Sequence, residues 1–407
     1  MTRRLFTTLC GLVFLVNFGR VAFAPLVPEF QQSLGLSAAA VGSVTTLAWV
    51  GTALPRIPIG YLLTRVRRER VVLATGVALV LAASFTARAD GLLALQAGSL
   101  AVGLSTGGYF VAAIPLIGSL YPDQTGQMVG IHGTASQLAP VIAPAAVLFA
   151  VAQLDDWRLV FWGLAAGATV VTLVLVFVFR GRSEPAGGAP ERDFGTALAR
   201  WRVILAGLGF VVGAGFVWQG TFNFYVSYLT AKGIAESTAN GLLTLTFAAG
   251  LPAFWLGGRL ADRLPNVPYL VGINATFVAG ILALTLVDGV IAVAAVSVVL
   301  GLVAHSLFPA VDTYMLSTLP PAGRASAYAV FSGVALLLES GGSGAVGALV
   351  DAGVSFATTY QLLAGGVGLV TLGVVAMSAV GRVPQPRWWV DADGVDIDGA
   401  VTDGGEP

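Results

Sequence analysis

Five ionisable side chains lie deep inside long apolar stretches of this sequence: Arg20, Arg56, His305, Asp312 and Glu339. A charge at the centre of a membrane costs about 2.5–3.5 kcal/mol on insertion scales, so such groups usually bind a ligand, pair with each other or carry protons. An arginine presents planar donors that fit two oxygens of a carboxylate or oxoanion. A carboxylate or an imidazole can take up and release a proton. The set therefore indicates anion binding together with proton coupling or charge pairing.

The composition shows what surrounds these charges. Of the 407 residues, 56% are hydrophobic and 10% are charged, against about 25% charged in soluble proteins, and the mean hydropathy is +0.85. The formal net charge is zero, so nothing suggests a nucleic-acid partner. One cysteine, Cys10, and two histidines, His132 and His305, allow no disulfide within the chain and supply no metal-ligand set. We expect a polytopic membrane protein without a metal or cofactor.

Twelve apolar stretches are long enough to cross a hydrocarbon core of about 30 Å as helices. They cover residues 5–29, 40–63, 70–89, 92–118, 127–152, 157–180, 202–229, 238–261, 267–287, 289–316, 325–350 and 355–380. The predicted fold is an all-α membrane protein whose twelve transmembrane helices form two pseudo-symmetric six-helix bundles. The predicted parts are an N-terminal half (1–180), a polar cytoplasmic linker (181–200), a C-terminal half (201–382) and a disordered acidic cytoplasmic tail (383–407).

The arginine distribution predicts the orientation in the membrane. With twelve spans, most of the 21 Lys and Arg residues fall on the side that carries both termini. The positive-inside rule makes this side the cytoplasm. We therefore expect a multi-pass protein of the cytoplasmic (inner) membrane with both termini in the cytoplasm.

The two halves repeat in sequence. At an offset of 198, "GLPAFWLGGRLADR" (250–263) matches "TALPRIPIGYLLTR" (52–65), and Gly103 matches Gly301. An even number of helices in each half gives parallel repeats related by an axis along the membrane normal, as in rocking transporters. Arg56 corresponds to Phe254 in this repeat, and Arg20 corresponds to Phe216 at an offset of 196. The buried positive charges therefore belong to the first half only.

The sequence resembles the major facilitator superfamily of secondary transporters over nearly its whole length. The family's loop motif Gly-x-Leu-Ala-Asp-Arg-x-Gly-Arg appears after helix 2 as "GYLLTRVRR" (60–68) and more fully after helix 8 as "GRLADR" (258–263). Thr64 replaces the aspartate of the first copy, and "WRLVF" (157–161) matches the motif that opens helix 6. The resemblance implies a role in conformational change for Gly60, Arg65, Arg68, Gly258, Asp262 and Arg263.

In this family helices 1, 4, 7 and 10 line a central cavity, helices 2, 5, 8 and 11 flank it, and the other four face lipid. The five buried charges lie on helices 1, 2, 10 and 11, where a water-filled path is implied. "RIPIG" from Arg56 resembles helix 2 of nitrate/nitrite porters, whose arginine holds the anion. Those porters carry a second arginine where Phe254 stands here, and their Gly- and Asn-rich motifs are missing. The resemblance implies an anion ligand in Arg56 but not nitrate specificity.

The depth of the charges suggests two layers. Arg56 and Asp312 lie about 12 Å from the inner surface, and Arg20 and Glu339 lie about 22 Å from it. We expect Arg56 to bind the anion, with Phe254 closing over it from the other half, and Arg20 to pair with Glu339 or with a second ligand. Asp312, Glu339 and His305 are candidates for proton coupling or charge pairing.

Gln219 and Asn223 are four residues apart and so share one helix face. They are candidates for hydrogen bonds either to a bound solute or between helices.

The predicted function is secondary active transport of a small solute, more specifically an anion, by rocking of the two halves. Uptake or export, and symport or antiport with a proton or another ion, are left open; we expect a monomer in the lipid bilayer. One alternative is a proton-coupled drug or metabolite exporter, in which Asp312 or Glu339 matters more than Arg56. Another is a transporter-like sensor that binds without flux. An enzyme or an ATP-driven pump is not expected, because no nucleophile–base spacing and no Gly-Lys-Ser/Thr phosphate loop occur.

Overall fold

The computed structural model describes residues 2–63, 65–180, 199–320 and 324–385. Thr64, most of the predicted linker (181–200) and most of the predicted tail (383–407) lie outside the described residues. Within the described part, all regular structure is helical, and twelve helical spans are long and apolar enough to cross a membrane. The predicted all-α class with twelve spans is therefore confirmed.

The first bundle contains eight α-helices and a short 3-10 turn. They are α1 (Thr2–Val21), α2 (Val27–Leu34), α3 (Ala38–Ala53), α4 (Arg56–Leu62), α5 (Arg68–Thr86), α6 (Leu92–Leu120), η1 (Pro122–Gln124), α7 (Thr125–Leu154) and α8 (Arg158–Phe179). The second bundle contains α10 (Trp201–Asn223), α11 (Tyr225–Ala231), α12 (Glu236–Ala261), α13 (Asn266–Leu286), α14 (Val290–Thr318), α15 (Arg324–Asp351) and α16 (Phe356–Ala379).

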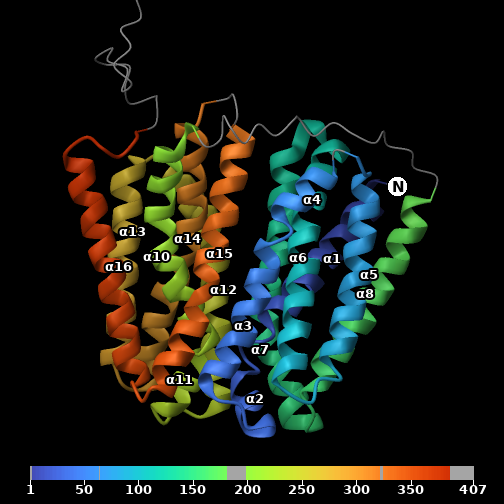
Figure 1. Ribbon diagram of the computed structural model, residues 1–407, viewed down its shortest axis with the longest axis horizontal. Helices are drawn as coiled ribbons and strands as arrows, with labels where there is room; N and C mark the ends of the chain where they lie inside the picture. The colour runs from blue at the N-terminus through green and yellow to red at the C-terminus, as the bar shows by residue number, and fades with distance from the viewer. Residues whose placement is uncertain (1, 64, 181–198, 321–323, 386–407) are drawn as a thin grey trace, which may run out of the picture.

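The two bundles stand side by side, with the short helices α2 and α11 at the end opposite the N-terminus (Figure 1). At that end α3 of the first bundle packs against α15 of the second, and α2 contacts α11. The bundles diverge toward the end that carries the N-terminus (Figure 1). Contact between the two halves is therefore concentrated at the α2–α11 end.

Three of the predicted spans, each expected as one continuous helix, are broken in the structure. Residues 5–29 divide into α1 and α2 around a turn at Ala22–Leu26, where Pro25 has no N–H to continue the helix. Residues 40–63 divide into α3 and α4 at Pro55, for the same reason. Residues 202–229 divide into α10 and α11 at Phe224, whose φ of −104° and ψ of 11° leave the helical range.

The predicted repeat is visible in how the helices pack. Gly103 of α6 lies against the carbonyl oxygen of Ala48 in α3, and Gly301 of α14 lies against that of Thr246 in α12; both pairs are 198 residues apart. A Cβ at either glycine would collide with that oxygen, so glycine permits the close helix approach. The halves differ one turn further along, because the ring of His305 occupies the position of Gly107 and packs against Gly250.

Candidate functional site

A cavity of about 400 Å³ lies between the two halves. The first half contributes residues from α1, α3, α4, α6 and α7, and the second contributes residues from α10, α12, α14 and α15. Its polar lining is Asn17, Arg20, Arg56, Gln137, Gln219, His305, Asp312, Tyr328, Ser332 and Glu339. Its aromatic lining also includes Trp49, Phe110, Trp218, Phe222, Phe247, Phe254, Phe308 and Phe331. The structure thus brings all five buried ionisable residues into one cavity, with Gln219 and Phe254 beside them.

Arg20 is positioned by neighbours in its own half. Its Nη2 donates to Asn17 Oδ1 at 2.5 Å, and its guanidinium lies 3.9 Å from the ring centre of Trp49. Asn17 is held in turn by donating to the Ser136 carbonyl at 2.8 Å. In the described chain Arg20 forms no ion pair with Glu339, and its Nη2 is hydrogen-bonded instead to Asn17, one turn away on the same helix face. Its Nε is buried without a hydrogen-bond partner among the described residues.

Arg56 opens α4 directly after the break at Pro55 and lines the cavity. It forms no ion pair within the described parts of the chain. The carboxylate of Asp312 instead accepts a hydrogen bond from the Tyr328 hydroxyl at 2.6 Å, which joins α14 to α15. The guanidinium is therefore not neutralised by a contacting carboxylate in this conformation.

Glu339 is 4% exposed and packs against Gly215 of α10. A Cβ at Gly215 would lie 2.6 Å from the Cγ of Glu339, so the glycine makes room for the carboxylate. Like the arginines, Glu339 makes no ion pair in the described part of the structure. An acid held this way at the edge of a cavity is suited to binding a proton or a cationic group.

His305 lies in a wall of aromatic rings contributed by the second half. Its Nδ1–H donates to the Gly301 carbonyl at 2.8 Å, a contact in which the carbonyl can only accept. The ring centres of Trp218, Phe247 and Phe254 are 5.6, 5.7 and 5.6 Å away. The arginines of the first half and this aromatic wall of the second half line the same cavity.

Gln219 and Asn223 have different surroundings although they share a helix face. Asn223 donates to the Gln219 carbonyl and to Ser343 Oγ, both at 2.8 Å, and so ties α10 to α15. Gln219 lines the cavity, and its Oε1 is buried without a partner among the described residues. Asn223 therefore makes hydrogen bonds between helices, and Gln219 stays a candidate for a hydrogen bond to a bound solute.

The cavity is closed at the α2–α11 end by contacts between α3 and α15. The carboxylate of Asp351 accepts from the backbone N–H groups of Ala38 and Ala39 at 2.9 and 3.0 Å. Thr46 Oγ1 accepts from the N–H of Gly344 at 3.0 Å. These bonds satisfy the unpaired N–H groups at the start of α3 and place a negative charge at its positive end.

The described loop-motif residues lie at the opposite end, and no hydrogen bond or ion pair between the halves is found for them in the described chain. Arg65 donates to Tyr61 Oη at 3.2 Å and Arg68 donates to the Pro115 carbonyl at 3.5 Å, both within the first half. Gly60 is buried in α4. Gly258 lies in the last turn of α12, Asp262 is the C-cap of that helix, and Arg263 follows it. Neither Asp262 nor Arg263 forms an ion pair in the described chain.

We expect Asp351→Ala to open the α2–α11 end. The variant loses two hydrogen bonds to a charged acceptor, each worth about 1.5–3 kcal/mol, so the population open at that end should rise at least tenfold. Spin labels at Gln32→Cys and Ser237→Cys, in a Cys10→Ser background, should report longer distances by pulsed electron resonance.

Asp288→Ala is the matched control for this experiment. Its carboxylate is also at the α2–α11 end, but it is 90% exposed, and among the described residues its ion pair is with Lys232 of the same half at 3.4 Å. An unchanged distance distribution in Asp351→Ala, or an equal change in Asp288→Ala, would contradict the assignment of Asp351 as a closing contact.

Two bundles, each with six membrane-spanning segments, enclose a cavity that is closed at one end. They define a transporter fold, one that supports secondary transport by alternating access. The chain matches the Major Facilitator Superfamily over residues 9–338 and therefore belongs to this family. A search of curated proteins found no match.

Solved structures show the same fold at low sequence identity. A bacterial homolog of the human lysosomal transporter Spinster, inward-facing and unoccupied, is 18% identical with a TM-score of 0.72, over 93% of this chain and 95% of that one. The occupied form of that homolog is 18% identical with a TM-score of 0.71, over 97% of each chain. A D-xylose-proton symporter is 15% identical with a TM-score of 0.72, over 92% of this chain and 96% of that one.

The sequence reading missed several cavity residues, and two of them left a signal. Asn17 precedes Arg20 by three residues, the spacing of neighbours on a helix face. Tyr328 precedes Glu339 by eleven residues, or about three helical turns, so both fall on one face of α15. Trp49 gave no such signal, because an aromatic residue does not stand out in an apolar stretch.

Proposed function

We propose that this protein transports a small organic anion across the cytoplasmic membrane, with a proton as the coupling ion. The observation that carries the proposal is the division of the cavity: Arg20 and Arg56 come from the first half, and neither is ion-paired among the described residues. Two such arginines favour an anion, because a buried charge without a partner is costly. The aromatic wall of the second half suits an organic rather than an inorganic anion.

We assign the end that carries the N-terminus to the cytoplasm, because most Lys and Arg residues belong to that side. With this orientation the closed α2–α11 end faces outward, and the structure represents an inward-facing state. Substrate then enters or leaves the cavity from the cytoplasmic side in this conformation.

Export of an organic cation is the second candidate function. Glu339 favours this function, because its carboxylate lines the cavity and forms no ion pair in the described structure. Trp218 also lines the cavity, and an aromatic ring attracts a cation. For such a substrate Glu339 would be the binding residue, and the arginines would repel the ligand.

Counterflow in proteoliposomes separates the two functions. Vesicles containing the purified protein are loaded with a panel of monocarboxylates, dicarboxylates, sulfonates or quaternary ammonium ions of matched size. We expect exchange of at least one anion class and no exchange of the cations. Exchange of the ammonium ions alone would overturn the proposal in favour of the cation exporter, and binding of anions without exchange would support the sensor.

A further inference from the structure

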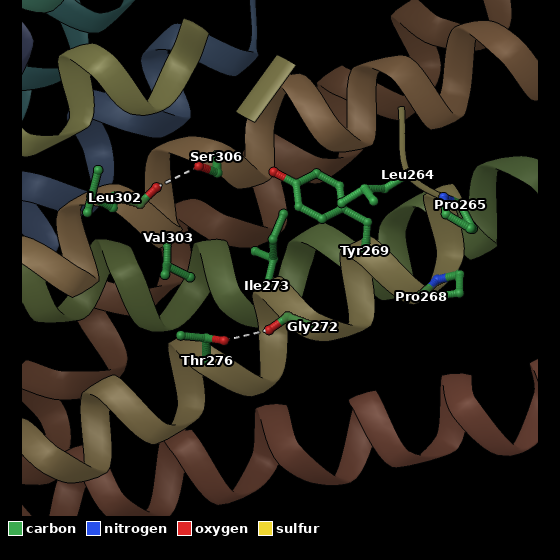
Figure 2. Close-up of a pocket in the computed structure, with 10 residues that line it drawn as sticks. All are labelled: Leu264, Pro265, Pro268, Tyr269, Gly272, Ile273, Thr276, Leu302, Val303 and Ser306. Atoms are coloured by element: carbon green, nitrogen blue, oxygen red, sulfur yellow. Dashed lines mark hydrogen bonds between the residues drawn. The ribbon is translucent and has the colours of Figure 1, made fainter. Parts of the chain in front are cut away.

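A second hollow, of about 480 Å³, lies on the outer surface between α13 and α14. Figure 2 shows it lined by Leu264, Pro265, Pro268, Tyr269 and Ile273 on α13 and the loop before it, with Val303 and Ser306 on α14. Gly272, Thr276 and Pro268 are exposed on this side of α13, a membrane-spanning helix. This α13–α14 groove therefore faces the hydrocarbon of the bilayer.

The polar atoms of the groove are already hydrogen-bonded to backbone carbonyls. Ser306 donates to Leu302 and Thr276 to Gly272, both at 2.8 Å, and Tyr269 donates to Gly257 at 3.4 Å. The remaining wall is alkyl and ring surface. A hydrocarbon chain fits such a groove, whereas a polar ligand would leave its own groups unpaired.

The groove adjoins the central cavity through one small void between α10, α13 and α14. This void of about 10 Å³ shares Ile273 and Val303 with the groove, and Gly215, Trp218 and Phe308 with the central cavity. The void is too small to hold a chain as it stands, and the side chains of Ile273, Val303, Trp218 and Phe308 line it where it meets the other two spaces. A continuous passage would require these four side chains to move.

A third hollow provides a contrast. It measures about 360 Å³, lies against α1, α7 and α8 in the first half, and includes Gly163 in its lining. It shares no lining residue with the central cavity. A void that adjoins both spaces is described for the α13–α14 groove, and this third hollow serves as its comparison.

We propose that the α13–α14 groove is the membrane-side mouth of a lateral route to the central cavity, and that it takes the hydrocarbon chain of an amphiphilic acid whose headgroup binds at Arg56. This inference rests on the proposed function, which it narrows to anions with one long alkyl chain. The chain lies in the groove because its wall is apolar, and the headgroup lies in the cavity because the arginines are there. Trp218 and Phe308 line the passage between them.

The test uses a sixteen-carbon carboxylate with a diazirine near the end of its chain, irradiated in proteoliposomes of the full-length protein. Peptide mapping should find label on α13 and α14 at least fivefold above that on the hollow beside Gly163. Gly272→Leu should reduce this label at least fivefold, because its side chain would fill the groove. A Cβ at Gly272 meets nothing within 4 Å, so we expect this variant to fold.

Gly163→Leu is the matched control. A Cβ at Gly163 also meets nothing within 4 Å, and a leucine side chain there would fill the hollow against α1, α7 and α8, which shares no lining residue with the central cavity. Labelling of α13 and α14 should be unchanged in this variant. Equal labelling of both hollows in the parent protein, or no loss in Gly272→Leu, would overturn the proposal.

Arg56→Lys links the groove to the headgroup site. It should lower labelling of the groove at least threefold if the chain and headgroup belong to one bound molecule. Undiminished labelling in this variant would mean that bilayer lipid alone fills the groove, and would overturn the inference. Exchange of butyrate is measured in parallel: Arg56-dependent exchange without groove labelling defeats this inference only, whereas no exchange of any carboxylate defeats the proposed function.

Discussion

Arg56→Lys is expected to lower anion transport by roughly 10–150-fold, with little change in the amount of folded protein in the membrane. Lysine keeps the charge but loses the two parallel N–H donors that fit a carboxylate. Loss of one hydrogen bond to a charged group corresponds to about 1.5–3 kcal/mol, which gives this range. Folding should be spared because Arg56 forms no ion pair in the described part of the chain that the exchange would break.

Counterflow of the best anion, normalised to protein reconstituted in the vesicles, measures this effect. Arg88→Lys is the matched control, because Arg88 lies outside the cavity, donates to the Ser84 carbonyl at 2.9 Å and stacks on Trp162 at 4.4 Å. We expect this control to transport like the parent. Parental rates in Arg56→Lys would falsify the anion-ligand role and favour the cation exporter.

The sequence was sufficient to predict the fold because hydrophobic length decides which segments cross a membrane. The twelve spans agree with the structure to within a few residues at most ends. The interruption at Ala22–Leu26 was missed because a proline in a membrane helix is compatible with either a kink or a break. The interruption at Phe224 has no proline and gave no local signal.

The sequence also identified the charged half of the site, since a charge in an apolar stretch stands out. It did not predict the partner of Arg20, because depth along a helix says nothing about the direction in which the side chain points. Arg20 and Glu339 were placed at similar depth, but Arg20 turns toward Asn17 and Trp49 while Glu339 packs against Gly215. Rotation about the helix axis is set by packing across the whole bundle.

Glu339→Gln is expected to abolish accumulation of the anion driven by a proton gradient while preserving counterflow. Glutamine has nearly the size of a protonated glutamate, so it should fit beside Gly215 without displacing α10. It cannot release a proton, so each transport cycle would proceed without one. The parent should accumulate substrate when a pH gradient is applied, and the variant should only equilibrate it.

The matched control is Glu29→Gln on α2, a carboxylate that does not line the cavity. It should accumulate substrate like the parent. Gradient-driven accumulation by Glu339→Gln would move the coupling role to another acid, and Asp312→Asn would then be tested in the same assay. We rank Asp312 second because its carboxylate already accepts a hydrogen bond from Tyr328, which joins α14 to α15. Glu339 accepts no such bond in the described structure and can bind a proton without breaking one.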